Sequence, residues 1–592
     1  MSKYLSPDIY FEQITRDERF KPLERAKINI AAFFGLSDRG PIQTPTRITS
    51  WEAYQRIFGG FSQVGYMGFS VFGFFNNGGQ ECFIIRVAHM DDPDPTKNAS
   101  RASVVLKDLY ARGTIEVQAV SEGSWGNKVK VAVGTPTRVH RTILLNDLYP
   151  GQNKARVDVS KGFEPGSIVR FTDGKQEAFV RLTRVDRKEI EWDPAQRVEV
   201  TLKEGVGTAE SVEFRLTITG EDDFEIFDNL AMDPAHSRYY GKVVNGASKY
   251  VELKDLQSPT EIPYNLPQVM TESLLEAGRD GNEWVTTEDY VGFSIGPGKR
   301  RGLWSLEEVD DVGILCFPDV MRSMRESRGF RGERDAEAVQ QAALDFCVRN
   351  RYCFALLDPP QGLTPTLVRE WRDRYDSKYA ALYYPWIKIL DPFSGANGAT
   401  VTIPPCGHIA GIYAKTDEEV GVHKPPANES INDVIALERP IDKDTQDAIY
   451  TEGVNCIRFF RGRGIRVWGS RTISSDAQWR HVNVRRIFNM LEKSIEHGTQ
   501  WAPFEPNDPE LWKMLNRLIS TFLTDLWRQG YMTGATPEEA FFVKCDDETN
   551  PPEVRDVGEV ICEIGVAAVR PLEFIVFRIG QRTKDIVLEE PV

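Results

Sequence analysis

The chain has 592 residues, a composition typical of globular proteins and a formal net charge of −15. Its length exceeds what one hydrophobic core holds and predicts roughly three or four domains. The acidic balance, with no basic tail or Lys/Arg block, argues against nucleic acid as a partner.

The first predicted element is a strand at residues 5–12. Its apolar residues Leu5, Ile9 and Phe11 share one parity and therefore one face of the strand. A polar, highly charged stretch at residues 15–27 separates this strand from the next element. The pattern alone leaves open whether the strand joins the protein's own sheet.

The following stretch predicts a buried strand within residues 28–40, a helix capped by Thr49 or Ser50, and a glycine-rich turn into a strand at residues 82–87. Its paired glycines lack the GxxxxGK[ST] spacing of a phosphate-binding loop. From about residue 102 to 220, short alternating apolar runs recur between turn signals, which predicts an all-β sandwich or barrel.

An α/β pattern comes next, and its order implies a parallel sheet. Ligands usually bind at the carboxyl ends of such strands, where Asp319 and Asp358 stand, so an enzyme is a fair hypothesis. The predicted elements are strands at residues 312–317, 353–357 and 379–384 and helices at residues 335–346 and 364–375.

Two amphipathic helices are expected near the C-terminus. The first is capped by Ser475 or Asp476 and closed by Gly498, and the second begins at Asp508-Pro509 and stops at Gly530. A basic face on an acidic chain suits an acidic partner, and a solvated face explains it about equally well. The basic residues are Arg480, Arg485, Arg486 and Lys493 on the first helix and Lys513, Arg517 and Arg528 on the second.

Three strands are predicted after these helices, within residues 541–543, 560–569 and 574–579. The last run has apolar residues on both faces of the predicted strand, so other elements must pack against both faces. Because this run lies near the end of the chain, it is free to leave its own domain and pair with a strand outside it. One face carries Phe574 and Val576, and the other carries Ile575, Phe577 and Ile579.

Several segments match one family pattern as a set: residues 122–127 (EGSWGN), 404–411 (PPCGHIAG), 467–472 (VWGSRT), 526–530 (LWRQG) and 570–575 (RPLEFI). Together they resemble contractile tail sheath proteins, the outer-tube subunits of contractile phage tails and of related phage-tail-like injection systems. Ala568 and Leu572 depart from the pattern without removing a strand.

The resemblance implies a multidomain α/β (α+β) fold: a sheath core with a subtilisin-like α/β domain, an inserted all-β domain, and a C-terminal α+β domain with strand-exchanging terminal arms. The expected units are an N-terminal arm at residues 1–22, the first part of the core at 23–101, the inserted outer β domain at 102–245, the subtilisin-like domain at 246–470, the tube-facing domain at 471–570, and a C-terminal strand and arm at 571–592.

The resemblance also implies a function. Copies would stack as hexameric rings around an inner tube and contract to drive it through a target envelope. The strands near residues 5–12 and 574–579 would join neighbouring subunits by strand addition, and the basic residues of the two helices would face the tube. The expected partners are further copies, the inner tube protein, and baseplate and terminator or cap proteins. No cofactor, metal, nucleic acid or membrane insertion is expected.

Nothing in the sequence predicts export. No apolar run approaches the roughly 18 residues of a membrane span, and residues 1–4 lack an apolar signal region. The eight cysteines are scattered without a CxxC pair, as expected of reduced, buried thiols. We expect assembly in a bacterial cytoplasm, as a component of a phage tail or phage-tail-like particle.

Two alternatives stay open. A hydrolase would use the α/β domain with a Ser/His/Asp triad around His408, yet no GxSxG elbow follows this histidine, and a buried, hydrogen-bonded histidine suits this position better. The other alternative is a non-contractile tail terminator or baseplate component. The sequence contains no HExxH motif, EF-hand loop or His/Cys cluster, so no metal site is predicted.

Overall fold

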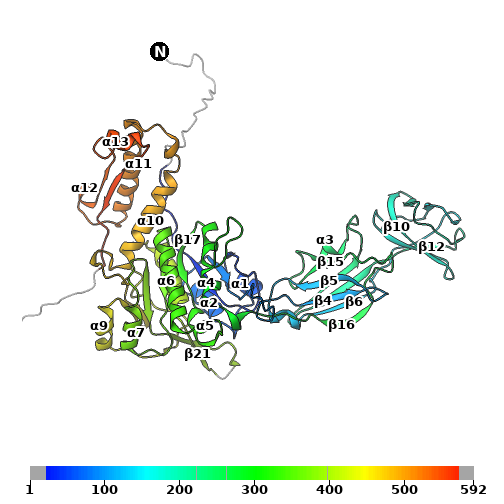
Figure 1. The fold of residues 1–592 in the computed structure, drawn as a ribbon, viewed down its shortest axis with the longest axis horizontal. Coiled ribbons are helices and arrows are strands. Elements are labelled where there is room, and N and C mark those ends of the chain that lie inside the picture. Colours follow the sequence, from blue (N-terminus) through cyan, green and yellow to red (C-terminus); the bar gives the residue numbers. More distant parts are fainter. Residues whose placement is uncertain (1–21, 222, 262, 396–397, 572–592) are drawn as a thin grey trace, which may run out of the picture.

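The computed structural model describes residues 22–571 apart from 222, 262, 396 and 397. A central α/β part carries a chain of β-sheets that extends to one side and a C-terminal unit above it (Figure 1). The terminal strands predicted around Leu5 and Phe574 lie outside the described residues.

The central part is built on a mixed sheet of eight strands, and the predicted parallel sheet is confirmed. Its inner strands are parallel, and β2 and β24 pair antiparallel at the two edges. In order across the sheet the strands are β2 (Thr46–Ile48), β3 (Cys82–Arg86), β1 (Ile30–Gly35), β17 (Val312–Cys316), β18 (Phe354–Leu357), β19 (Ala380–Tyr384), β23 (Val454–Phe460) and β24 (Gly464–Trp468).

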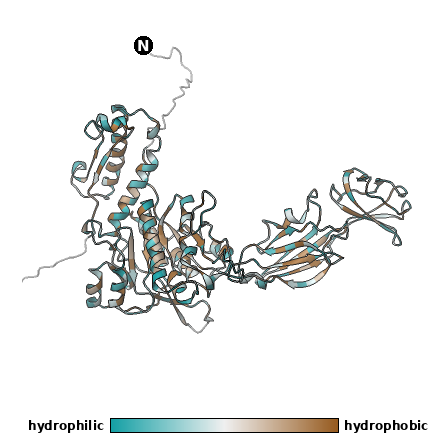
Figure 2. Cartoon of the chain, in the orientation of Figure 1, coloured by the Kyte–Doolittle hydropathy of each residue, from teal (hydrophilic) through white to brown (hydrophobic). Residues whose placement is uncertain are grey.

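Helices cover both faces of this sheet, which explains why its inner strands are apolar at both parities. All residues of β1, β17, β18 and β19 are buried, and the apolar strands stand out inside the helices (Figure 2). The helices are α1 (Trp51–Phe58), α2 (Met67–Asn76), α4 (Thr287–Val291), α5 (Val320–Glu326), α6 (Glu333–Asn350), α7 (Pro365–Arg372), α8 (Cys406–Glu419) and α9 (Lys443–Tyr450). A small sheet, β21 (Thr400–Ile403), β20 (Ile387–Leu390) and β22 (Ala436–Leu437), flanks them.

The β-rich region consists of two units with separate hydrophobic clusters, where the sequence predicted one domain. The inner β unit continues past residue 245, the boundary expected from the sequence, because β16 pairs with β6. Its elements are β4 (Ser103–Lys107), β5 (Gly113–Ala119), β6 (Lys130–Gly134), β13 (Phe214–Thr219), β14 (Phe224–Leu230), α3 (Tyr240–Val244), β15 (Val251–Asp255) and β16 (Met270–Leu274).

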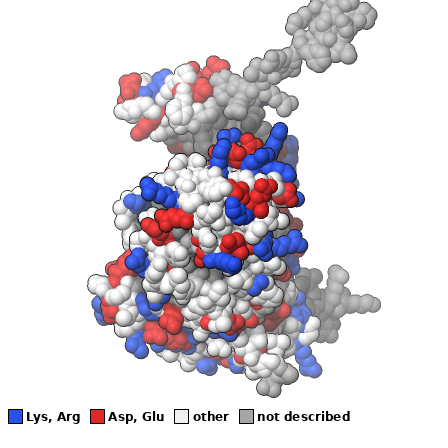
Figure 3. Space-filling view, turned by 90° about the vertical axis from the view of Figure 1, so that its right-hand side faces the viewer, with Lys and Arg blue, Asp and Glu red and all other residues white. Residues whose placement is uncertain are grey.

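The outer β unit is a six-stranded sheet that projects farthest from the centre (Figure 1). Seen from that side, basic and acidic side chains are interspersed, without a broad field of one sign (Figure 3). Its strands are β7 (Arg141–Ile143), β8 (Lys154–Arg156), β9 (Ile168–Thr172), β10 (Glu177–Asp186), β11 (Glu189–Trp192) and β12 (Thr208–Ser211).

The C-terminal unit pairs two long helices with a two-stranded antiparallel sheet. Asp508 accepts hydrogen bonds from the amides of Glu510 and Leu511, which confirms the predicted cap of α11. Among the described residues, no helix is long and apolar enough to cross a bilayer. The elements are α10 (Val482–Gly498), α11 (Pro509–Arg528), α12 (Pro537–Ala540), β25 (Phe541–Lys544), α13 (Pro552–Asp556) and β26 (Glu563–Val566).

Arg86 fastens the inner β unit to the central sheet. Its side chain is fully buried at the end of β3. One guanidinium nitrogen donates to the carbonyl oxygens of Gly40, at 2.9 Å, and Glu122, at 2.8 Å. The adjoining Gly123 has φ +139°, and a Cβ there would lie 2.4 Å from the carbonyl oxygen of Asp38. Only glycine fits this contact between the two parts.

We predict that Gly123→Ala destabilises the protein by about 1–3 kcal/mol more than Gly174→Ala. Both glycines have positive φ, but a Cβ on Gly174 would meet nothing within 4 Å, so the comparison isolates the steric clash. Thermal unfolding with limited proteolysis of the junction measures the difference. Equal stability of the two variants would contradict the tight junction.

Candidate functional site

The helix α10 joins segments that are far apart in the sequence. Residues 22–28 run beside it: Leu23 packs against Gly498, and the amide of Ala26 donates to Ser494 Oγ at 2.9 Å. Near the other end of α10, Asn483 Nδ2 donates to the carbonyl oxygen of Val569 at 3.0 Å. The described chain therefore starts and ends at opposite ends of one helix about 25 Å long.

The sequence predicted an exposed basic face on α10, and this prediction is wrong for three residues. Arg485, Arg486 and Lys493 are 1–2% exposed, so they cannot reach a neighbouring protein. Arg486 forms a bidentate ion pair with Asp417 on α8, at 2.5 and 2.8 Å, and also donates to the carbonyl oxygen of Ile28. The physical reason is that α10 has neighbours on both faces, the central part on one side and α11 on the other.

The other two buried cations of α10 are also held internally. Lys493 Nζ donates to the carbonyl oxygen of Asp310 at 2.6 Å and to that of Lys27 at 3.3 Å. Arg485 donates to Glu492 at 2.6 Å, and its guanidinium lies 4.6 Å from the ring centre of Trp479 and 4.8 Å from that of Tyr379. Cation–π contacts of this kind fix the start of α10 on the central sheet.

The remaining predicted basic residues are exposed. Arg480 precedes α10, and Lys513, Arg517 and Arg528 lie on the outer face of α11. Arg528 pairs with Asp525 on the same helix at 3.5 Å. The opposite face of α11 buries Leu515, Ile519, Phe522 and Leu526. Contact of these four basic residues with a tube stays a prediction.

The strands β25 and β26 form a sheet whose outer edges pair with no other strand of the described chain. One face packs on α11 through Phe541 and Val543, while Phe542 on the other face is 57% exposed. Two-stranded sheets of this size are only marginally stable alone, and further strands increase their stability. An open edge is also where an added strand finds unpaired backbone groups.

The predicted enzyme crevice is occupied by the protein's own backbone. Asp319, after β17, is fully buried and accepts hydrogen bonds from the amides of Leu36, Tyr66 and Met67, the last at the start of α2. Asp358, after β18, accepts from the amide of Cys406, the first residue of α8. Burial raises the pKa of Asp319 to about 6 and that of Asp358 to about 7.

His408 lies inside the contact between α2 and α8. It is fully buried, and a Cβ on Gly73 would lie 2.2 Å from its Cε1 atom. The predicted burial is confirmed, but the predicted hydrogen bond is wrong, because neither ring nitrogen has a partner among the described residues. Burial lowers the pKa of His408 to about 4, so the ring is neutral at pH 7. A hydrolytic triad needs a bonded histidine, which this arrangement does not supply.

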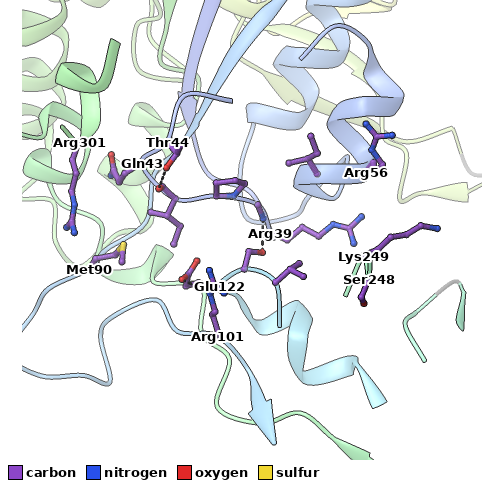
Figure 4. A pocket seen from close by; sticks show the side chains of 16 residues that line it. Arg39, Gln43, Thr44, Arg56, Met90, Arg101, Glu122, Ser248, Lys249 and Arg301 are labelled. Atoms are coloured by element: carbon purple, nitrogen blue, oxygen red, sulfur yellow. Dashed lines mark hydrogen bonds and ion pairs between the residues drawn. The ribbon is translucent and has the colours of Figure 1, made fainter. Parts of the chain in front are cut away.

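A hollow of about 490 Å³ lies where the central part meets the inner β unit (Figure 4). Several of its cations already have partners: Arg101 pairs with Glu122 at 3.2 Å, and Arg301 pairs with Asp91. These pairs lower the attraction of the hollow for an added anion. The basic residues that line it are Arg39, Arg56, Arg101, Lys249 and Arg301.

Two family models match consecutive parts of the chain. The phage tail sheath protein central domain matches residues 329–473, and the phage tail sheath C-terminal domain matches residues 474–582. The chain belongs to the tail sheath family. These matches include four of the eight strands of the central sheet, α10, α11 and the β25–β26 pair.

Relatives with established names agree with this assignment. The tail sheath protein of Vibrio phage KVP40 is 26% identical over 393 residues, which cover 60% of this chain and 57% of the relative. A putative prophage major tail sheath protein of Pseudomonas aeruginosa is 26% identical over 248 residues, covering 41% of this chain and 62% of the relative. The matches thus span less than two thirds of either relative.

The overall fold is also that of solved sheath proteins. The helical sheath of the anti-feeding prophage in its contracted state superposes with a TM-score of 0.51 and 20% identity, covering 97% of this chain and 99% of that one. This likeness establishes the mixed α/β sheath fold with its several sheets.

Two buried charged residues that fix this arrangement, Asp417 and Arg86, were not predicted from the sequence. Arg86 is a charged residue at the end of the apolar strand β3, whereas Asp417 lies in the polar last turns of α8, beside Lys415 and Glu418. Charged residues are almost never fully buried unless they are paired, so the sequence carried a signal for Arg86 and none for Asp417. The pattern gives no indication of which partner each one has.

We predict that Arg486→Met destabilises the protein by about 3–5 kcal/mol, because it leaves Asp417 buried without its cation. The double variant Arg486→Met/Asp417→Leu should recover most of that loss, because it removes both charges. Arg528→Met, at an exposed arginine, is the control and should change stability by no more than about 0.5 kcal/mol. Urea unfolding compares the variants, and similar losses for Arg486→Met and Arg528→Met would rule out the buried pair.

Proposed function

We propose that this chain is a structural subunit of a contractile sheath that polymerises around an inner tube and contracts to drive it through a target envelope. The observation that carries the proposal is the open β25–β26 sheet in a member of the tail sheath family. Copies would stack as hexameric rings, with baseplate and terminator proteins at the ends. The protein would act through its surfaces and would need no catalytic activity.

Strand addition would hold the copies together. The apolar segments around Leu5 and Phe574 have the pattern of strands, and β25 and β26 offer edges on which strands from neighbours would pair. Main-chain hydrogen bonds would then link subunits independently of most side chains. The charged stretch at residues 15–21 would act as a hinge between such an arm and the rigid protein.

The rigid part would move as a body during contraction. Buried contacts of α10 with residues 22–28 and α8 tie the C-terminal unit to the central sheet, so these parts would shift together. Subunits would slide past one another while the strand-paired arms stayed joined. The free energy would be stored in the extended lattice at assembly, and contraction would need no nucleotide.

The outer face of α11 is the proposed contact with the tube. Lys513, Arg517 and Arg528 lie exposed on it, in a chain whose net charge is −15. A local basic stripe would complement an acidic tube surface and help to set the register of binding. Arg480 would add to the same contact.

Deleting residues 1–13 should abolish polymerisation and leave a folded, soluble chain, since the described fold begins at residue 22. Electron microscopy of the expressed protein, with circular dichroism to check folding, measures the outcome. Normal sheaths from the truncated chain would refute the role of the N-terminal arm. Full-length protein that stays monomeric with and without tubes would instead favour a non-contractile terminator or baseplate component.

Replacing Lys513, Arg517 and Arg528 with glutamate should weaken tube binding about tenfold or more, because three exposed charges on the proposed contact surface change sign. The fold should be unaffected, since these side chains are exposed. The matched control reverses Lys161, Lys175 and Lys188, which are exposed on the outer β unit. Co-sedimentation with the tube protein tests the change, and equal binding by both triple variants would disprove the proposed contact.

A further inference from the structure

Cys545 and Cys562 lie at the end of the β25–β26 pair from which the connecting segment, residues 546–561, leaves and returns. The last pair of the strand register is Lys544 opposite Glu563, and the cysteines are the residues that come directly after Lys544 and directly before Glu563, just outside the two strands. Directly opposite residues of antiparallel strands have Cα atoms about 4.5–5.5 Å apart. Disulfides form at Cα separations of roughly 4.4–6.8 Å. The register therefore brings the two thiols within bonding range.

Both side chains lie on the same face of the hairpin. Phe541 and Val543, at the same parity as Cys545, pack toward α11, and Cys545 packs with Leu511 and Trp512 of that helix. Cys562 joins the same cluster from the opposite strand. Each thiol shifts the pKa of the other, as expected of two side chains that lie close together.

We infer that Cys545 and Cys562 are an oxidation site that closes to a disulfide when the chain leaves a reducing environment. The disulfide would link the end of β25 to the start of β26 and close a loop of residues 546–561, which include α13. A cytosol keeps such thiols reduced, so the site would stay open there and close in an oxidising medium. The bond would form within a single chain and would not depend on assembly.

The reaction is thiol–disulfide exchange with a small disulfide oxidant. Cys562 is partly exposed and Cys545 is 5% exposed, so the Cys562 thiolate attacks the oxidant first. This step gives a mixed disulfide and releases one thiol. The Cys545 thiolate then attacks Cys562 Sγ, forming the internal bond and releasing the second thiol. The chain loses two electrons and two protons, and the oxidant is reduced to two thiols.

Burial controls how fast this exchange runs. It raises the pKa of Cys562 to about 12, so few thiolates exist at neutral pH and closure is slow. A second thiol pair in the chain provides an internal comparison. Cys316 and Cys406 also contact each other, but both are at most 1% exposed inside the central part. Because a small oxidant cannot reach these two buried thiols, we expect Cys316 and Cys406 to stay reduced.

The test is prolonged incubation of the folded, full-length chain with oxidised glutathione, followed by non-reducing tryptic mass spectrometry. Trypsin cuts at Arg555, between the two cysteines, so closure yields two peptides joined by a disulfide. Thiol titration in denaturant should fall from eight free thiols to six. Eight remaining thiols, or a stable glutathione adduct on Cys562 without the linked peptides, would overturn the inference.

The variant Cys545→Ser checks the order of steps. It should retain glutathione on Cys562, because no second thiol is present to displace it. Hydrogen exchange of residues 546–561 in the wild-type chain should slow after oxidation, since the bond closes this loop. A linked Cys316–Cys406 peptide in place of the expected one would also overturn the inference.

Discussion

The buried ion pair between Arg486 and Asp417 is the contact on which the arrangement of this protein depends. It joins α10 to α8 and, through the carbonyl oxygen of Ile28, to the chain that enters the central sheet. Each charge is almost fully removed from water, so each needs the other. The cations at Arg485 and Lys493 extend the same contact along one helix. The C-terminal unit is therefore held at a fixed position on the sheet.

This rigidity sets limits on how the protein can work in an assembly. The two ends of the described chain emerge at opposite ends of α10, so arms that continue from them would start from points fixed on one body. The β25–β26 sheet belongs to the same body and has open edges. A strand added at these edges would therefore be held by a body whose parts are fixed to one another.

Much of the fold could be predicted because its signals are local. The alternation of strands and helices between residues 312 and 384 and the Asp508-Pro509 helix start depend on neighbouring residues alone. The burial of Arg486 could not be predicted in that way, since its partners lie 69 and 458 residues away. Likewise, the division of the β-rich region into two units depends on which strands pair at long range. The terminal arms remain a prediction, because they lie outside the described residues.

The central sheet keeps the layout of a ligand-binding fold and uses it for support. Asp319 and Asp358 stand at the carboxyl ends of parallel strands, where an enzyme would hold a ligand. Here each accepts hydrogen bonds from backbone amides at the start of a helix, α2 for Asp319 and α8 for Asp358. His408 then fills the space between those two helices. Because the strand ends are sealed by the protein's own backbone, the surfaces left for function are the outer faces and open strand edges.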